Sequence, residues 1–342
     1  MTSRSKRFAI REAMSRLGRS RNLILFKLGM LKVSTLILAL TDRCNLKCSM
    51  CDIWRKESLG ACRELDFGKV GQLFRLKSLK ALKHITLSGG EPFLREDLYE
   101  IVSTVKKAYP RARINIPSNG TLSAKIAEFL RRAEKYGNIG LEFTLLGIKK
   151  HDEMTGVKGS FANLENTIHE TMKRSPRLDL KAKFVITPRN FSDIKGVADY
   201  CRDKNMPLTI KAVENVSSYT NSLDYPRNLN DRNFVFSPAE LKTVIGDLKK
   251  IENNRAVNRV CTLGLIERLS GKKTNRECLV PAASLFINSG GVIYRCRMRD
   301  AIGSLDNLPF NFAAPRNKPD SGGFNDKDRI CSQCVCLLRF LM

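Results

Sequence analysis

From residue 33 onward, short apolar runs alternate with longer segments in which apolar residues recur every three to four positions. The short runs are typical of buried strands, and the longer segments are typical of amphipathic helices. The predicted strands are residues 35–40, 84–87, 113–117, 140–145, 181–186 and 208–212. The predicted helices are residues 67–79, 97–107, 123–136, 161–174, 191–204 and 238–253.

This alternation predicts an α/β fold. A succession of βα units favours a parallel sheet, because each crossover helix returns the chain to the same edge. We expect the sheet to curl into a partial (βα)6 barrel, similar to an incomplete TIM barrel, with the chemistry at the carboxyl ends of its strands. Ser237 and Pro238 match the N-cap and first position of the last predicted helix.

Three regions depart from this alternation. Residues 1–34 form a basic extension, which is either a helix that caps the barrel or an amphipathic helix that contacts an anionic membrane surface or a nucleic acid. Residues 215–236 are polar and predict a long loop. Beyond the barrel, assigned to residues 35–255, periodicity fades, and residues 256–342 predict a small domain stapled by metal.

The charge balance is strongly basic, with 60 Lys+Arg against 34 Asp+Glu and a net charge of +26. Such an excess indicates an anionic substrate, nucleic acid or membrane surface as partner, or only a basic surface. The 11 cysteines gather mainly in an early and a late group. Without a signal peptide or a predicted transmembrane helix, metal or redox chemistry in the cytoplasm is favoured over a disulfide framework.

The early group is Cys44, Cys48 and Cys51, which directly follows the first predicted strand with CxxxCxxC spacing. Three thiolates on one loop can bind three irons of a [4Fe–4S] cube and leave the fourth iron open to a chelating molecule. Structural zinc takes four protein ligands, and the next cysteine along the chain is Cys62.

This loop resembles the cluster motif of the radical S-adenosylmethionine (SAM) superfamily, and Met50 occupies the family's hydrophobic position before the third cysteine. The resemblance implies the partial barrel and a [4Fe–4S] cluster whose open iron binds SAM. It also implies an external electron donor, flavodoxin- or ferredoxin-like. In the family, reductive cleavage of SAM gives a 5′-deoxyadenosyl radical, which takes a hydrogen atom from the substrate.

A second motif follows the second predicted strand. Residues 88–92, with Gly89, Gly90 and Glu91, resemble the family's glycine–glycine–glutamate–proline motif. The two glycines allow a close backbone approach at a strand end. The resemblance implies SAM binding here, with the Glu91 carboxylate available to the SAM ammonium group.

Further matches follow the third and fourth strands. Asn119 resembles the family's Asn-Gly turn residue, and it either helps to place SAM or serves only the turn. Thr144 keeps a hydroxyl that could reach the SAM ribose, whereas Leu146 replaces the acid that the family often has nearby. His151 fits a loop or capping residue rather than a general base. No catalytic acid or base can be assigned.

The late group surrounds residues 287–294, whose apolar–turn–apolar pattern predicts a hairpin. The arrangement resembles the SPASM domain of radical SAM enzymes, and more closely its shortened twitch form. It implies one auxiliary [4Fe–4S] cluster, with Cys336 competing for the last position and a zinc knuckle as the alternative. The implied ligands are Cys278, Cys296, Cys331 and Cys334. Isolated cysteines are typically buried small apolar residues, which we expect of Cys62, Cys201 and Cys261.

These features favour an oxidative radical SAM enzyme. The auxiliary cluster would accept the second electron from a small sugar-like alcohol or a peptide side chain. The twitch-like size favours a small molecule, because residues 1–34 are too few for an added peptide-binding domain. Two alternatives stay open: modification of RNA or another anionic macromolecule, and a non-catalytic iron–sulfur or zinc protein.

Overall fold

One sheet organises the molecule. The computed structural model describes residues 30–213, 235–271, 279–296 and 301–307, together with residues 21, 22, 24, 25 and 28. In these residues the strands lie in the order β6-β5-β4-β3-β2-β1-β7-β8-β9. Their bounds are β1 (Thr35–Thr41), β2 (His84–Gly89), β3 (Arg113–Ser118), β4 (Ile139–Leu145), β5 (Asp179–Ile186), β6 (Leu208–Ala212), β7 (Ser284–Ile287), β8 (Val292–Tyr294) and β9 (Ala301–Ser304).

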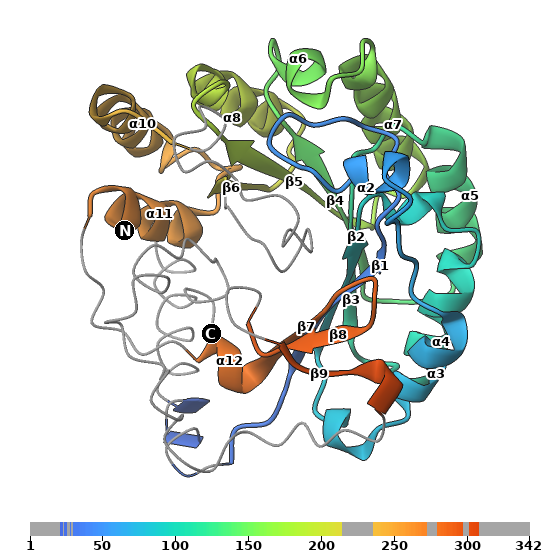
Figure 1. Ribbon diagram of the computed structural model, residues 1–342. Coiled ribbons are helices and arrows are strands. Elements are labelled where there is room, and N and C mark those ends of the chain that lie inside the picture. Colours follow the sequence, from blue (N-terminus) through green and yellow to red (C-terminus); the bar gives the residue numbers. More distant parts are fainter. Residues whose placement is uncertain are drawn as a thin grey trace.

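The seven strands from β6 to β7 in this order are parallel. Leu36 of β1, for example, pairs with Ile85 of β2 and with Leu285 of β7. The ends of the sheet, β6 and β9, do not pair with each other, so the sheet of the described residues stays open. The predicted α/β fold with a partial barrel is confirmed, and Figure 1 shows helices α3 to α8 around the outside of the curved sheet.

The predicted helices all form, with two of them divided. The prediction for 67–79 splits into a helix and a 3-10 turn, and that for 191–204 begins with a 3-10 turn. The longer helices are α3 (Phe67–Phe74), α4 (Leu98–Ala108), α5 (Ser123–Ala133), α7 (Ser160–Arg174), α8 (Ile194–Asp203), α10 (Pro238–Ile251) and α11 (Arg259–Leu269). The short elements are α2 (Arg55–Ser58), α6 (His151–Thr155), α12 (Val280–Ala283), η1 (Lys77–Leu79), η2 (Pro92–Leu94), η3 (Phe191–Asp193) and η5 (Leu305–Asn307).

The start of α10 shows how local sequence sets an element. The Ser237 hydroxyl accepts from the backbone N–H of Glu240 at 3.3 Å, and the Ser237 N–H donates to the Glu240 carboxylate at 2.7 Å. This capping box satisfies two backbone groups that the first turn of a helix leaves open. The predicted N-cap and the proline at the first helical position are confirmed.

The two faces of the parallel sheet differ in character. Residues such as Leu141, Phe143 and Phe184 are fully buried and share one apolar core with helix residues such as Leu164. The alternate residues of the same strands point to the opposite, inner face, because successive side chains of a strand alternate. On β4 and β5 this inner face carries partly exposed polar residues, including Thr144. The inner face can therefore receive a ligand without opening the core.

The sheet continues beyond residue 255. β7 pairs with β1, and β8 returns antiparallel to β7, with Ile287 opposite Ile293. The predicted hairpin in residues 287–294 is confirmed. No apolar periodicity predicts α11, which buries Cys261, Leu265 and other residues on several sides. The boundary between residues 255 and 256 stays a prediction, but the residues after it contribute strands to the same sheet.

Several predictions fall outside the described residues. They are the extension at residues 1–20, most of the 215–236 loop, and the cysteines Cys278, Cys331, Cys334 and Cys336. None of the helices in the described part of the chain combines the length and the apolar character that crossing a bilayer requires.

Candidate active site

The early cysteines lie on a loop that begins where β1 ends, at the carboxyl edge of the parallel strands. All three side chains are partly exposed, and the Cys51 N–H donates to the Cys48 carbonyl at 3.0 Å. Burial, followed by the charges of Cys51 and Cys44, raises the pKa of the Cys48 thiol well above its usual value. Because such charges act over short distances, the three sulfurs must lie near one another.

The arrangement of these thiols suits a cluster better than a single metal ion. No three His, Cys, Asp or Glu side chains among the described residues lie close enough to hold one ion. In a cubane cluster each cysteine binds a different iron, so its ligands need not meet at one point. Burial raises the pKa of Cys44 to about 12, so a cation must displace the proton before this sulfur can bind as a thiolate.

The Gly-Gly turn at the end of β2 packs against the start of the cysteine loop. A Cβ at Gly89, whose φ is 135°, would lie 2.3 Å from the Thr41 carbonyl oxygen, and one at Gly90 would lie 2.1 Å from the Arg43 oxygen. The Gly90 N–H also donates to the Thr41 carbonyl at 2.8 Å. The close approach predicted from the two glycines is present, and its partner is the backbone that leads to Cys44.

Glu91 is buried at the same edge, with 1% of its surface exposed. Its carboxylate accepts from the Phe93 N–H at 3.1 Å, the Ser118 hydroxyl at 2.9 Å and the Asn119 N–H at 2.7 Å. Burial raises the pKa of Glu91 to about 7, against the lowering effect of these donors. Glu91 therefore ties the end of β2 to the end of β3. A contact with the SAM ammonium would add to these three bonds and stays a prediction.

Asn119 joins the turn after β3 to the cysteine loop. Its side-chain oxygen accepts from the Thr121 N–H at 2.9 Å, which is the turn role that the sequence allowed. Its side-chain nitrogen donates to the Asn45 oxygen at 2.8 Å, and the side chain also forms a hydrogen bond with Cys44. Both interactions fix the loop that carries the first cysteine.

The segment after β4 is structural at two of its positions. Leu146 is 1% exposed, its N–H donates to His151 Nδ1 at 3.2 Å, and its carbonyl accepts from Asn190 at 3.0 Å. Leu146 thus belongs to the buried core. Burial lowers the pKa of His151 to about 4, so the neutral ring accepts this bond. His151 is the first residue of α6 and neither a loop residue nor its N-cap, which is Lys150.

Helix α6, which begins at His151, forms backbone hydrogen bonds with the cysteine loop. The Lys47 N–H donates to the Thr155 carbonyl and the Ser49 N–H to the Met154 carbonyl, both at 2.9 Å. These carbonyls belong to the last turn of α6, where they have no partner within the helix. The residues on either side of Cys48 are therefore anchored by an element more than a hundred positions later in the chain.

Sequence reasoning missed Asp42, which lies two residues before the first cysteine and is 1% exposed. Its carboxylate accepts from Lys56 Nζ at 3.1 Å and from the Ser289 hydroxyl at 2.6 Å. Ser289 lies in the turn between β7 and β8, so Asp42 joins the cysteine loop to the C-terminal hairpin. The only local signal is an acid next to the motif, which does not reveal a partner 247 residues away.

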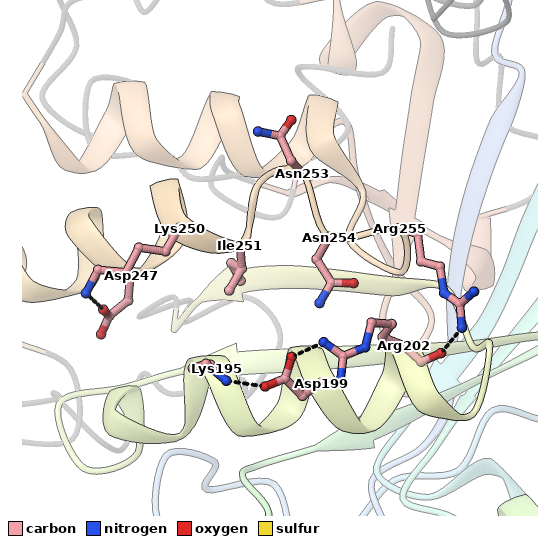
Figure 2. Close-up of a pocket in the computed structure, with 9 residues that line it drawn as sticks. All are labelled: Lys195, Asp199, Arg202, Asp247, Lys250, Ile251, Asn253, Asn254 and Arg255. Carbon is pink, nitrogen blue, oxygen red and sulfur yellow. Dashed lines mark hydrogen bonds and ion pairs between the residues drawn. The ribbon is translucent and has the colours of Figure 1, made fainter. Parts of the chain in front are cut away.

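A cleft of about 490 Å³ lies between α8 and α10. Figure 2 shows that its side chains come from these two helices and the turn after α10. Asp199 pairs with two of its cations, Lys195 at 2.5 Å and Arg202 at 2.6 Å. None of its lining residues comes from the strand ends that carry the cysteine loop.

Comparison with known proteins agrees with this geometry. The chain is 29% identical over 174 residues to a probable GTP 3′,8-cyclase of Methanococcus vannielii, which is 51% of this chain and 56% of that protein. It thus spans little more than half of that relative's length. A probable GTP 3′,8-cyclase of Methanococcus aeolicus is 23% identical over 293 residues, 84% of this chain and 92% of that protein.

The crystal structure of Streptococcus suis SuiB bound to S-adenosylmethionine has the same fold, with a TM-score of 0.63 at 14% identity. The match covers 94% of this chain and 75% of SuiB. The family model described as the radical SAM superfamily matches residues 38–210, which run from β1 into β6 and include the cysteine loop. The family's cofactors are a [4Fe–4S] cluster and SAM, and the chain belongs to the radical SAM superfamily.

Proposed function

We propose that this enzyme binds a [4Fe–4S] cluster through Cys44, Cys48 and Cys51, and uses it with SAM to oxidise a substrate inside the barrel. The observation that carries the proposal is the packing of the cysteine loop against the Gly89 and Gly90 backbone at the carboxyl edge of the sheet. When bound, the cluster and SAM together supply a 5′-deoxyadenosyl radical that removes a hydrogen atom from the substrate.

The chain's own residues would bind and orient these groups. Asn119 holds the loop at Cys44 and Asn45, and Glu91 fixes the turn that carries Asn119. Met50 lies on the same loop, and Thr144 is the inner-face hydroxyl near the end of β4 that we assign to the SAM ribose. Because these groups come from four successive strand ends, SAM would lie across the top of β1 to β4.

Two further parts of the proposal concern electrons. An external donor, a flavodoxin- or ferredoxin-like protein, would reduce the first cluster in the reducing cytoplasm. An auxiliary cluster on Cys278, Cys296, Cys331 and Cys334 would accept the second electron from the substrate. The β7–β8 hairpin supports this second assignment, since Cys296 follows β8 by two residues.

For the substrate, we favour a small polar molecule. The relatives named as probable GTP 3′,8-cyclases make GTP the first compound to assay, followed by sugar-like alcohols. The net charge of +26 is consistent with an anionic substrate.

The test is anaerobic reconstitution with iron and sulfide, followed by reduction with dithionite and measurement of 5′-deoxyadenosine. We expect wild type to form it and the Cys44→Ala/Cys48→Ala/Cys51→Ala variant to form none, with iron falling from two clusters to one. Cys62→Ala is the matched control, because this thiol follows the same loop and is partly exposed, unlike the buried position expected for it from the sequence. Wild-type rates of 5′-deoxyadenosine formation in the triple variant would contradict the assignment.

A further inference from the structure

The inner face of β4, β5 and β6 carries a group of charged side chains. The strand register sets Glu142 opposite Lys181, Thr144 opposite Lys183, and Val185 opposite Lys211. Because the intervening residues, such as Phe143, Phe184 and Ile210, are fully buried in the core, the charged residues must lie on the opposite face.

Within this group the positive charge exceeds the negative. Lys183 Nζ lies 3.4 Å from the Glu142 carboxylate, and the two side chains are only 18% and 16% exposed. Lys181 pairs with Asp179 at 2.8 Å, and Arg113 contacts the same carboxylate. Lys211 forms no ion pair with another described residue. Within this group of described residues, four cations face two carboxylates, Glu142 and Asp179, which gives the group an excess of two positive charges.

Lys211 nevertheless lies close enough to act on Glu142. Burial alone would raise the pKa of Glu142, but the charges of Lys183 and Lys211, the hydrogen bond from Lys183 and the charge of Lys181 together hold this pKa below its usual value. Glu142 thus faces both lysines at once. Half-buried cations in excess are costly unless a further anion offsets them.

The positive charge of Lys183 lies next to two residues that we assign to SAM binding, Thr144 and Glu91. Its cross-strand neighbour is Thr144, and its charge also reaches the carboxylate of Glu91 after β2. Lys211 lies one level nearer the carboxyl ends of the strands than Lys183, since it pairs with Val185. The charge of Lys183 and Lys211 therefore lies on the inner wall of the barrel, toward its carboxyl edge, whereas Lys181 and Arg113 pair with Asp179 at the start of β5.

We propose that Lys183 and Lys211 bind an anionic group of the substrate, a phosphate or a carboxylate, in competition with the Glu142 carboxylate that faces both ammonium groups. This inference rests on the proposed function, because it takes the bound molecule to be the one that is oxidised. An anion held at this level would place the rest of the substrate beneath the cysteine loop, within reach of a radical formed there.

The experiment measures binding to the reconstituted protein by calorimetry at constant ionic strength. The probes are inorganic triphosphate, citrate and GTP, which separate a phosphate site from a carboxylate site. We expect Lys183→Gln and Lys211→Gln each to weaken binding of the preferred probe about tenfold or more, the effect of losing one charge-assisted hydrogen bond. Glu142→Gln should tighten binding, because it removes the carboxylate that competes for both lysines.

Lys195→Gln is the matched control. This lysine faces the outer cleft of Figure 2 and already pairs with Asp199, so its loss should leave the affinity unchanged. Thermal melting of each variant checks that it folds.

Three results would overturn the proposal: no binding of any probe to wild type below about 1 mM, equal affinity in wild type and both lysine variants, or weaker binding in Glu142→Gln. None of these depends on SAM cleavage, so failure of the radical chemistry would be recognised separately.

Discussion

The two faces of β4 and β5 have opposite properties, although they are built from neighbouring residues. Phe143 and Phe184 on the outer face are fully buried in the apolar core. Thr144 and Lys183, one position before or after them, face the interior of the barrel and stay partly exposed. Residues for stability and residues for ligand binding therefore alternate along one strand, so substitutions at adjacent positions should have effects of different kinds.

The largest effect should come from the outer face. Phe143→Ala removes a fully buried ring, which we expect to lower the free energy of unfolding by about 3–5 kcal/mol in urea denaturation. Its neighbour Thr144→Ala should cost about 1 kcal/mol or less, yet it should slow 5′-deoxyadenosine formation. A loss of stability in Thr144→Ala as large as that in Phe143→Ala would remove the distinction between the faces.

A second substitution tests the carboxyl edge of the sheet, where the Gly89–Gly90 turn packs against the cysteine loop. Gly90→Ala places a Cβ 2.1 Å from the Arg43 oxygen, so the backbone leading to Cys44 must move. We expect a loss of about 1–3 kcal/mol, together with lower iron content after reconstitution. Gly246→Ala in α10 meets nothing within 4 Å, and it should stabilise the protein by about 0.5–1 kcal/mol. Full cluster loading in Gly90→Ala would show that this approach does not position the loop.

The smallest effect concerns the loop after β4 and depends on pH. Burial lowers the pKa of His151 from its ordinary value of 6.5 to about 4 in the folded protein, so between these values the unfolded chain binds one proton more than the folded chain. Folding stability should therefore fall as the pH drops from 6.5 toward 4. His151→Gln keeps an acceptor for the Leu146 N–H but does not titrate. The stability difference between variant and wild type should change by about 2 kcal/mol between about pH 7.5 and 5. Parallel pH profiles would show that the ring is not buried in its neutral form.

The parallel sheet could be predicted because its signals are local. The predicted strand 208–212 has the bounds of β6, and β4 begins one residue before its prediction. The same holds for the cysteines and Gly89, since their spacing and their place after a strand can be read within a few residues. The close packing of Gly89 and Gly90 on the cysteine loop follows from glycine's lack of a Cβ.

Other features could not be predicted because they depend on distant or non-periodic contacts. Helix α11 buries several of its sides, so no stripe of apolar residues marks it. The role of Glu91 depends on donors from the turn after β3, which a motif alone does not reveal. The lysines of the inner face lie in ordinary-looking strands. Their proximity to Glu142 becomes visible only with the register.

Strand β1 is synthesised early, but one of its edges is covered last. Leu36 pairs with Ile85 on one side, and its partner on the other side, Leu285, is synthesised much later. At about 5–20 residues per second, this edge stays unpaired for on the order of ten seconds or more during translation. The hydrogen bond from Ser289 to the Asp42 carboxylate forms only after a similar delay. The loop that carries Cys44 therefore gains its last support only when the C-terminal hairpin emerges, so cluster insertion into a nascent or shortened chain would meet a loop held on one side only.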